Sequence, residues 1–164
     1  MKKIPYVIFL IMIFTSICGA QSLESGIGVS LNTPAGNFSD VAKNGYGGAF
    51  MVKLGVPIID ITGSVEYISF GEKDIAGIKY NASAWGINAG ARISVFPFIS
   101  AGAELGNYWL TVSADNGTNK ADNTENKVAF TPLLAANIGM FEGSVRYAII
   151  SNASFISIRA GIYF

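Results

Sequence analysis

The sequence contains no histidine, and this absence removes a large part of enzyme chemistry. Without histidine there is no Ser–His or Cys–His nucleophile pair and no His-ligated metal site. Carboxylates remain as acid–base candidates, but we expect the arginines near them to neutralise them. The sequence therefore predicts a protein that is not an enzyme and that needs no cofactor or metal.

Charge is also scarce, and neither sign dominates. Charged residues make up 13% of the 164 residues, with 11 basic and 11 acidic side chains, whereas an ordinary soluble domain has about 25%. A chain without basic excess does not displace the counterions of a nucleic acid, so we expect no nucleic-acid partner. Apolar residues reach 51% and aromatic residues 12%, which excludes intrinsic disorder.

The single cysteine, Cys18, lies in a segment that resembles a targeting signal. Lys2 and Lys3 precede an apolar run over residues 4–17, and Cys18-Gly19-Ala20 follows. A basic start, a short apolar run and small residues before a cut are typical of a secretory signal peptide. We therefore predict a cleavable signal peptide over residues 1–20 and one domain over 21–164. The alternative, a lipoprotein acylated at Cys18, is disfavoured by the bulky Ile17 before it. The mature chain then contains no disulfide.

Beyond residue 21, apolar residues recur at every second position. This period of two predicts strands rather than helices. Eight strand segments follow from it, near residues 23–31, 48–56, 59–68, 83–95, 98–110, 128–140, 141–149 and 154–164. One face of each segment is apolar and contains no charged residue.

The opposite face contains all the charges within these segments, together with Gly, Ser, Thr and Asn. The charges are nearly balanced, and small residues surround them, as expected for a narrow interior in which charges pair. We therefore predict a charge network inside a barrel, formed by Glu24, Lys53, Asp60, Glu66, Arg92, Glu104, Glu142, Arg146 and Arg159.

The connections and the aromatic residues indicate which side faces lipid. Long polar connections (roughly 32–47, 69–82 and 111–127) alternate with short ones (near 57–58, 96–97 and 140–141), as in an outer-membrane barrel. Aromatic residues of the apolar face gather near the two ends and predict two girdles. The outer girdle comprises Phe50, Tyr67, Trp85, Trp109, Phe130 and Tyr147, and the inner girdle comprises Phe141 and Phe164.

A sheet that crosses a membrane must close on itself, because an unpaired amide in hydrocarbon costs several kcal/mol. The fold predicted here is all-β: an eight-stranded, antiparallel, up-and-down transmembrane β-barrel. The alternative is a secreted, lipocalin-like binder with its apolar face turned inward, which would dissolve without detergent.

Two segments resemble those of small outer-membrane barrels. Gly26 to Leu31, followed by Asn32-Thr33-Pro34-Ala35-Gly36-Asn37-Phe38-Ser39-Asp40, is similar to the first strand and loop of OmpX- and OmpA-like barrels. The alternating segment 155–164, with Ile162 and Phe164, looks like the C-terminal signal that the barrel-assembly machinery of Gram-negative bacteria recognises. The resemblance implies a monomer in the outer membrane, surrounded by lipid and lipopolysaccharide.

Three local features lead to further expectations. Arg146 and Arg159 fall nearly opposite each other on the inward face, so we predict an acid between them, with Glu24 or Glu142 as the nearest candidates. Pro132 cannot donate to a ladder, so we expect a bulge there or a strand that begins at Leu133. Residues 115–126 resemble a calcium-binding loop, but Lys120 stands where such a loop has its turn glycine. We therefore expect at most weak cation binding by Asp115, Asp122 and Glu125.

Two functions fit this architecture. The first is a structural or surface-interaction role in adhesion or envelope integrity, with the loop 111–127 as the contact surface for an extracellular ligand. The alternative is a narrow channel for small or hydrophobic solutes. Glycines on the inner face could leave room for it, at positions 26, 28, 86, 90, 102, 106, 139 and 161.

Overall fold

The computed structural model describes residues 22–56, 58–75, 77–115, 117 and 120–164. The predicted signal peptide, residues 1–20, lies outside this part of the chain. Within the described part, the elements are β1 (Ser22–Pro34), η1 (Gly36–Asp40, a 3-10 helix), β2 (Lys43–Gly55), β3 (Ile59–Gly71), β4 (Lys73–Ile75), β5 (Ile78–Phe96), β6 (Ile99–Asp115), β7 (Lys120–Ile138), β8 (Phe141–Ile150) and β9 (Phe155–Tyr163).

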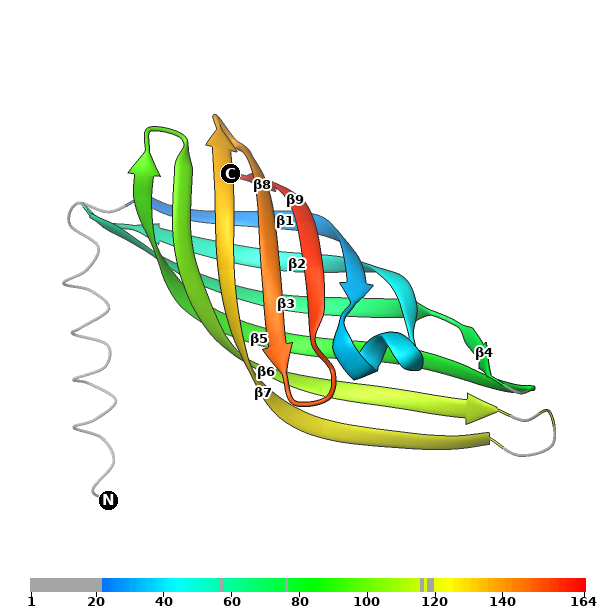
Figure 1. The fold of residues 1–164 in the computed structure, drawn as a ribbon. Helices are drawn as coiled ribbons and strands as arrows, with labels where there is room; N and C mark the ends of the chain where they lie inside the picture. Colours follow the sequence, from blue (N-terminus) through cyan, green and yellow to red (C-terminus); the bar gives the residue numbers. More distant parts are fainter. Residues whose placement is uncertain (1–21, 57, 76, 116, 118–119) are drawn as a thin grey trace, which may run out of the picture.

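The strands form one closed antiparallel sheet (Figure 1). Apart from the short β4, consecutive strands pair with each other, so that β3 pairs with β5, and β1 pairs with β9 to complete the wall. The short β4 pairs only with the start of β5 and lies at one end of the barrel. The predicted fold, an eight-stranded up-and-down barrel, is therefore confirmed.

The two ends of the barrel differ in their connections. The short connections from β2 to β3, from β5 to β6 and from β7 to β8 lie at one end, called here the turn end. Gly139 has a φ of 60°, a conformation that glycine adopts without strain, and it permits the two-residue turn before β8. The other end, called here the hairpin end, carries η1, β4, the β6–β7 hairpin and the β8–β9 turn.

The strands at the hairpin end are longer than the sequence predicted. The expected loop 111–127 is mostly strand, because β6 and β7 stay paired from Ile99↔Ala136 to Asp115↔Lys120. β5, β6 and β7 project beyond the other strands as a small sheet (Figure 1). Both faces of this extension are largely polar, so no apolar period of two marks it. The prediction of a loop was wrong for that reason.

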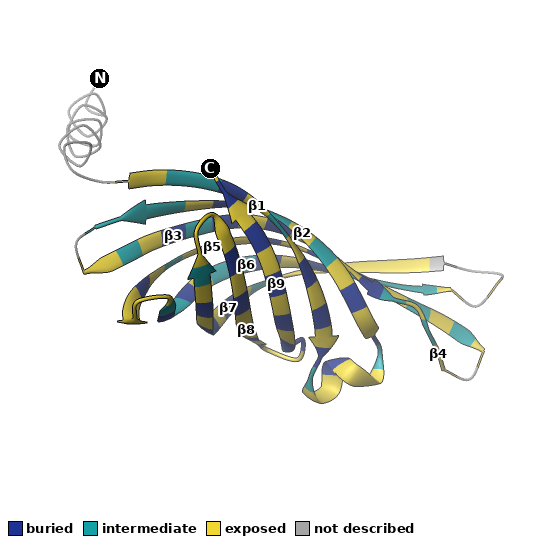
Figure 2. Cartoon of the chain, turned by 90° about the horizontal axis from the view of Figure 1, so that it is seen from above, coloured by how far each residue is buried: buried dark blue, intermediate teal, exposed yellow. Residues whose placement is uncertain are grey.

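The apolar face of the strands lies on the outside of the barrel. Buried and exposed residues alternate along β8 and β9 (Figure 2). Every outward position of β8 is exposed, including Val145 at 53%. Side chains of this kind in contact with water would be costly, whereas hydrocarbon accommodates them. No helix in the described part of the chain is long and apolar enough to cross a membrane.

Pro132 lies inside β7, and neither expectation for it was right. The strand runs through it without a bulge, and Pro132 pairs in register with Ala103 of β6. On the other side, the β7–β8 ladder pairs Phe130↔Ile149 and Leu133↔Arg146 and omits the two positions between them. The ring nitrogen of Pro132, which has no hydrogen to donate, therefore faces β8. It interrupts the β7–β8 ladder without shifting its register.

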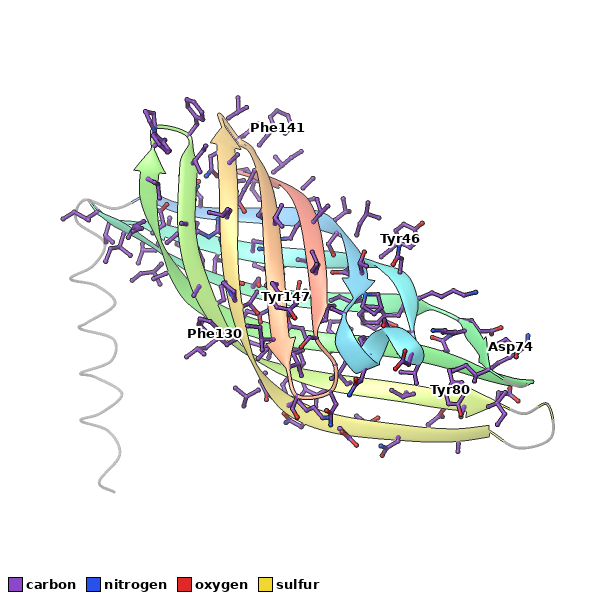
Figure 3. The ribbon with its side chains drawn as sticks, in the orientation of Figure 1. Tyr46, Asp74, Tyr80, Phe130, Phe141 and Tyr147 are labelled. Carbon is purple, nitrogen blue, oxygen red and sulfur yellow. The ribbon has the colours of Figure 1, made fainter. Side chains whose placement is uncertain are left out.

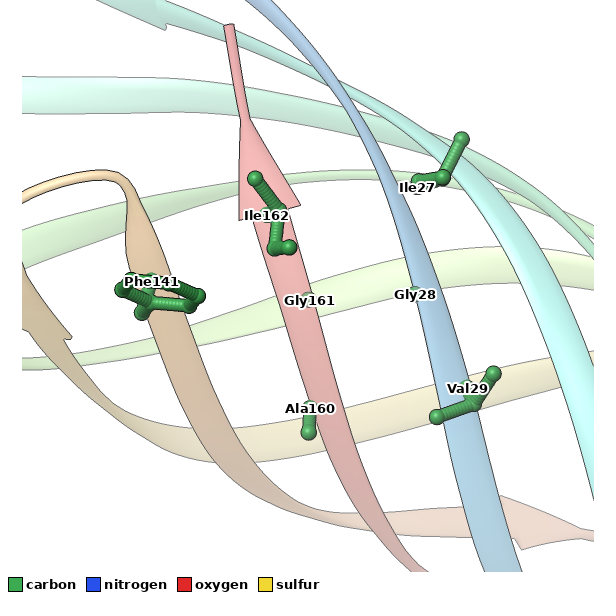
Figure 4. Close-up of a pocket in the computed structure, with 7 residues that line it drawn as sticks. All are labelled: Ile27, Gly28, Val29, Phe141, Ala160, Gly161 and Ile162. Carbon is green, nitrogen blue, oxygen red and sulfur yellow. The ribbon is translucent and has the colours of Figure 1, made fainter.

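The seam between the first and last strands carries a shallow groove on the outer surface. Gly28 of β1 pairs with Gly161 of β9, and the groove has a volume of about 350 Å³. Its walls are apolar and come from β1, β8 and β9 (Figure 4): Ile27, Val29, Phe141, Ala160 and Ile162. The closing seam is thus as apolar as the rest of the outer surface.

Candidate functional site in the lumen and at its outer mouth

Six charged side chains fill the middle of the lumen. Each belongs to a residue with at most 4% of its surface exposed, and they come from β3, β5, β6, β8 and β9. Three are acidic and three are basic: Glu66, Glu104, Glu142, Arg92, Arg146 and Arg159. Full burial of charges is tolerated only where they pair and hydrogen-bond.

Arg146 is the centre of this layer. Its Nη1 donates to Glu66 Oε2 at 2.8 Å, and its Nη2 donates to Glu104 Oε2 at 2.6 Å. The planar guanidinium thereby joins β8 to both β3 and β6 across the barrel. One side chain fixes the distance between three strands of the wall.

Arg92 extends the layer toward the turn end. Its Nη1 donates to Glu142 at 2.6 Å, and its Nη2 lies 3.7 Å from Glu104. Thr62 donates to the same Glu104 at 3.4 Å. Each acid of the layer therefore contacts at least one guanidinium.

The acid between Arg146 and Arg159 is Glu66, not Glu24 or Glu142. Glu66 Oε2 lies 2.8 Å from Arg146 Nη1 and 3.9 Å from Arg159 Nη1. The expectation of an acid between the two arginines was right, but its identity was wrong. Glu66 lies on β3, across the lumen from β8, and its carboxylate reaches Arg146 there.

The other three charges of the predicted network lie apart from this layer, near the turn end. Glu24 and Lys53 are register partners on β1 and β2, with a 2.8 Å ion pair and a Glu24 side chain that is 36% exposed. Lys53 Nζ also lies 4.5 Å from the centre of the Tyr163 ring. Asp60 is half-buried at the start of β3. The nine predicted charges thus form a buried layer of six and a rim of three.

An apolar plug lies above the charged layer, on the hairpin side, and sequence reasoning missed it. Phe38 of η1 contacts Phe70 edge-on with ring centres 5.0 Å apart, and Phe155 lies between Phe70 and Tyr108 at 5.7 and 5.9 Å. Tyr108 also donates a hydrogen bond to Glu66, which joins the plug to the charged layer. Phe70, Tyr108 and Phe155 share the parity of the charged face, and this signal could have identified the plug.

The inner-face glycines within the strands do not leave an open lumen, because other side chains lie over them. Gly139 was wrongly assigned to the inner face, since it lies in the turn between β7 and β8. A Cβ at Gly86 would stand 2.5 Å from the ring of Tyr108, and one at Gly102 would stand 2.8 Å from Cγ of Arg92. Met51 lies over Gly28 and Gly161 in the same way. These glycines make room for the filling side chains, so they do not support the channel hypothesis.

The eight predicted girdle residues all lie on the outer surface: Phe50, Tyr67, Trp85, Trp109, Phe130, Tyr147, Phe141 and Phe164. Phe141 stands at the turn end, and Phe130 and Tyr147 lie farther toward the hairpin end (Figure 3). Tyr67 and Trp85 contact each other with ring centres 4.9 Å apart. Sequence reasoning missed Phe96 and Phe98, two exposed aromatic residues beside the short β5–β6 turn.

The mouth of the barrel contains a cavity of about 260 Å³ above the plug. Apolar and polar side chains line it side by side: Phe38, Val41, Leu110, Val112 and Ala153 are the apolar ones, and Asn123, Glu125, Lys127 and Asn152 are the polar ones. Lys127 contacts Glu125 at 2.8 Å and donates to the Ser151 carbonyl at 3.0 Å. The hydrogen bond and the charge of Lys127 lower the pKa of the Glu125 carboxyl.

The three carboxylates that suggested a cation site do not gather. Asp115 accepts a hydrogen bond from the Gly117 amide at 2.7 Å, at the tip of the hairpin. Asp122 and Glu125 are an odd number of residues apart on β7, so their side chains leave opposite faces of the strand. The described residues include no group of three or more side chains placed to hold a metal ion.

Comparison with known proteins shows the fold of small outer-membrane barrels. No protein-family model and no curated protein matches this chain. Ail, the attachment invasion locus protein of Yersinia pestis, is 17% identical with a TM-score of 0.63, covering 88% of this chain and 97% of Ail. Neisserial surface protein A is 10% identical with a TM-score of 0.59 and covers the same shares. A designed transmembrane β-barrel is 13% identical with a TM-score of 0.51, covering 87% of this chain and 94% of the design. The chain therefore has the fold of an outer-membrane β-barrel.

Proposed function

We propose that this protein is an integral outer-membrane β-barrel that acts at its hairpin end as a surface-interaction protein, without catalysis. In this proposal a signal peptide over residues 1–20 exports the chain, and the barrel-assembly machinery inserts it through the segment that ends with Ile162 and Phe164. Lipid and lipopolysaccharide surround the apolar wall of a monomer, and the hairpin end faces outward.

The observation that carries the proposal is the contrast between the lumen and the hairpin end. Charged side chains fill the lumen and an apolar plug covers them, so the interior offers little to a solute. The strands β5, β6 and β7 instead project at the hairpin end (Figure 1), and beyond the register pair Trp85 and Trp109 their residues are mostly polar. Surface of this kind suits contact with a partner outside the membrane.

A protein of the same fold supports a role in ligand binding at the cell surface. Ail has been crystallised in complex with the heparin analogue sucrose octasulfate. That ligand belongs to Ail, and the low identity does not carry it over to this chain. The fold is nevertheless compatible with an extracellular ligand.

Shortening the β6–β7 hairpin is expected to abolish the surface interaction. Val112 and Asn123 are register partners, so an Asn-Gly turn can replace residues 113–122 and leave the rest of the ladder paired. Cells that display this variant should attach to surfaces coated with matrix proteins, or to epithelial cells, at least tenfold less than cells that display the full-length protein. Equal attachment of the shortened and the full-length protein at equal surface display would contradict the proposal. The matched control replaces Gly139-Met140 by Asn-Gly at the turn end and should attach normally.

The channel alternative has its own test. The purified barrel in a planar lipid bilayer is expected to give no discrete conductance steps, because Arg92, Arg146 and Phe155 lie within the lumen. Reproducible single-channel steps that disappear in unfolded protein would instead support the channel.

A further inference from the structure

The wall of the barrel contains a second groove, larger than the one at the seam, where the β7–β8 ladder is interrupted. Its volume is about 570 Å³, within the range of about 300–1,000 Å³ that is typical of small-molecule sites. Its lining comes mainly from β6, β7, β8 and β9, is mostly apolar, and includes Ala101, Pro132, Leu134, Val145, Tyr147 and Ile156. Because the outer surface of an outer-membrane barrel faces hydrocarbon, this groove is open to the acyl chains of the membrane.

One backbone carbonyl at this groove faces a residue that has no N–H. The register on either side of the interruption places Pro132 of β7 opposite Tyr147 of β8. The Asn137 amide of β7 donates to the Phe98 carbonyl, on the β6 side, at 2.9 Å. Backbone N–H groups alternate in direction along a strand, so the nitrogen of Pro132, an odd number of positions from Asn137, faces β8. The Tyr147 carbonyl therefore receives no hydrogen bond from Pro132.

This carbonyl calls for a donor from outside the chain. A carbonyl without a donor is costly inside a membrane, because hydrocarbon offers no hydrogen bond. Pro132 and Tyr147 both line the groove, and Tyr147 lies on the outer wall (Figure 3). A molecule in the groove can therefore supply the missing hydrogen.

The surroundings of the groove favour a neutral donor. A charged group would lose its hydration among these apolar side chains. Arg146 also lines the groove, but Glu66 and Glu104 engage its guanidinium in the lumen, so it does not offer a partner for a phosphate. A hydroxyl group on an acyl chain is both neutral and a donor.

We propose that this groove binds the acyl chain of a membrane lipid that carries a hydroxyl group on that chain. The chain lies against Ala101, Leu134 and Ile156, and its hydroxyl donates to the Tyr147 carbonyl in place of the N–H that Pro132 lacks. The apolar lining supplies affinity, and the carbonyl supplies selectivity for the hydroxylated chain. The site depends on a barrel that lies in a membrane, and it does not depend on contacts made by the hairpin end.

A competition between two lipids tests the proposal. The barrel is refolded into nanodiscs that contain equal amounts of two phosphatidylethanolamines, one with a 3-hydroxytetradecanoyl chain and one with the unmodified chain. Native mass spectrometry then measures which lipid the released barrel retains. We expect a preference of about fivefold for the hydroxylated lipid, which corresponds to one net hydrogen bond. Pro132→Ala restores an N–H opposite the Tyr147 carbonyl, so this variant should still retain lipid but lose the preference.

Filling the groove gives the second arm of the experiment. Ala101→Phe places a ring in the groove and should reduce the retention of both lipids at least fivefold. The matched control is Ala89→Phe, at an exposed position of β5 outside the groove. This control should retain both lipids as the original barrel does.

Four results would overturn the proposal. The first two are equal retention of the two lipids by the original barrel and a preference that survives in Pro132→Ala. The others are equal losses of lipid in Ala101→Phe and Ala89→Phe, and a second copy of the chain that covers the groove in place of lipid. None of them changes the proposed surface interaction, which the shortened hairpin tests separately.

Discussion

Replacing Arg146 by methionine is expected to lower the free energy of unfolding by about 3–5 kcal/mol. The substitution keeps much of the volume but leaves Glu66 and Glu104 buried without their closest cation. Their remaining guanidinium contacts are long, 3.9 Å from Arg159 to Glu66 and 3.7 Å from Arg92 to Glu104. Equilibrium unfolding of the refolded barrel in urea measures the effect.

Two controls separate the loss of the ion pairs from the loss of packing. Lys53→Met removes the cation of the rim pair with Glu24, and because that pair is partly exposed we expect a cost of at most about 1 kcal/mol. The double variant Arg146→Met, Glu66→Gln should be more stable than Arg146→Met alone, because one uncompensated charge is gone. If Arg146→Met is no more costly than Lys53→Met, the charged layer does not hold the barrel together.

An arginine on the outer wall is expected to have the second largest effect. Val145 lies in the middle of β8 among other apolar outward side chains, and it pairs with Ile158 of β9. Placing Arg at this position should cost about 2–4 kcal/mol if the wall faces hydrocarbon at mid-depth. Unfolding from phospholipid vesicles measures this, because vesicles keep a fixed hydrocarbon thickness.

The matched control is Thr124→Arg, with its side chain on the same outer surface but beyond Trp109 on the projecting hairpin. There the new charge meets water, and we expect a change of within about 0.5 kcal/mol, as for most surface substitutions. Equal stability of Val145→Arg and the original protein would mean that the wall does not face lipid.

The sequence was sufficient to predict the faces of the strands and the closed barrel. A period of two assigns each side chain to one face, and the absence of charge from the apolar face then identifies the lipid side. Val145 and Arg146 are adjacent in the chain, yet their opposite environments follow from parity alone. Such assignments need no knowledge of which strands face each other across the lumen.

The contacts across the lumen could not be predicted in this way. Glu66 and Arg146 are 80 positions apart, and they meet only because the tilt and stagger of the strands bring them to one height. The alternation assigns each side chain to one face of the sheet, but it does not give its position along the barrel axis. Glu24 and Glu142 were therefore equally good candidates for the acid beside Arg146. The same limit applies to the plug: parity places Phe70 and Phe155 in the lumen, but it does not predict that they contact each other across the barrel.

The hairpin end was harder to predict for a different reason. Outside the membrane neither face of a strand must be apolar, so Thr111 and Thr124 can pair in β6 and β7 without any periodic signal. Phe38 sits in a short 3-10 helix, within a segment that reads as a polar loop. The ladder between β6 and β7 holds the hairpin, and the contact of Phe38 with Phe70 of β3 holds the 3-10 helix, so neither needs an apolar pattern in its own sequence.

The central claim is that the apolar face of the wall contacts lipid while the charged face is enclosed. Nitroxide labels at single cysteines test it most directly, since the chain from Gln21 onward contains no cysteine of its own. Labels replacing Leu134, Val145 and Ile158, which are register partners on neighbouring strands, should collide readily with dissolved oxygen and poorly with a water-soluble nickel chelate in vesicles. A label replacing Thr124, beyond Trp109 on the projecting hairpin, should show the reverse. Ready access of the nickel chelate to position 145 would contradict the inside-out polarity from which the fold, the charged layer and the proposed function all follow.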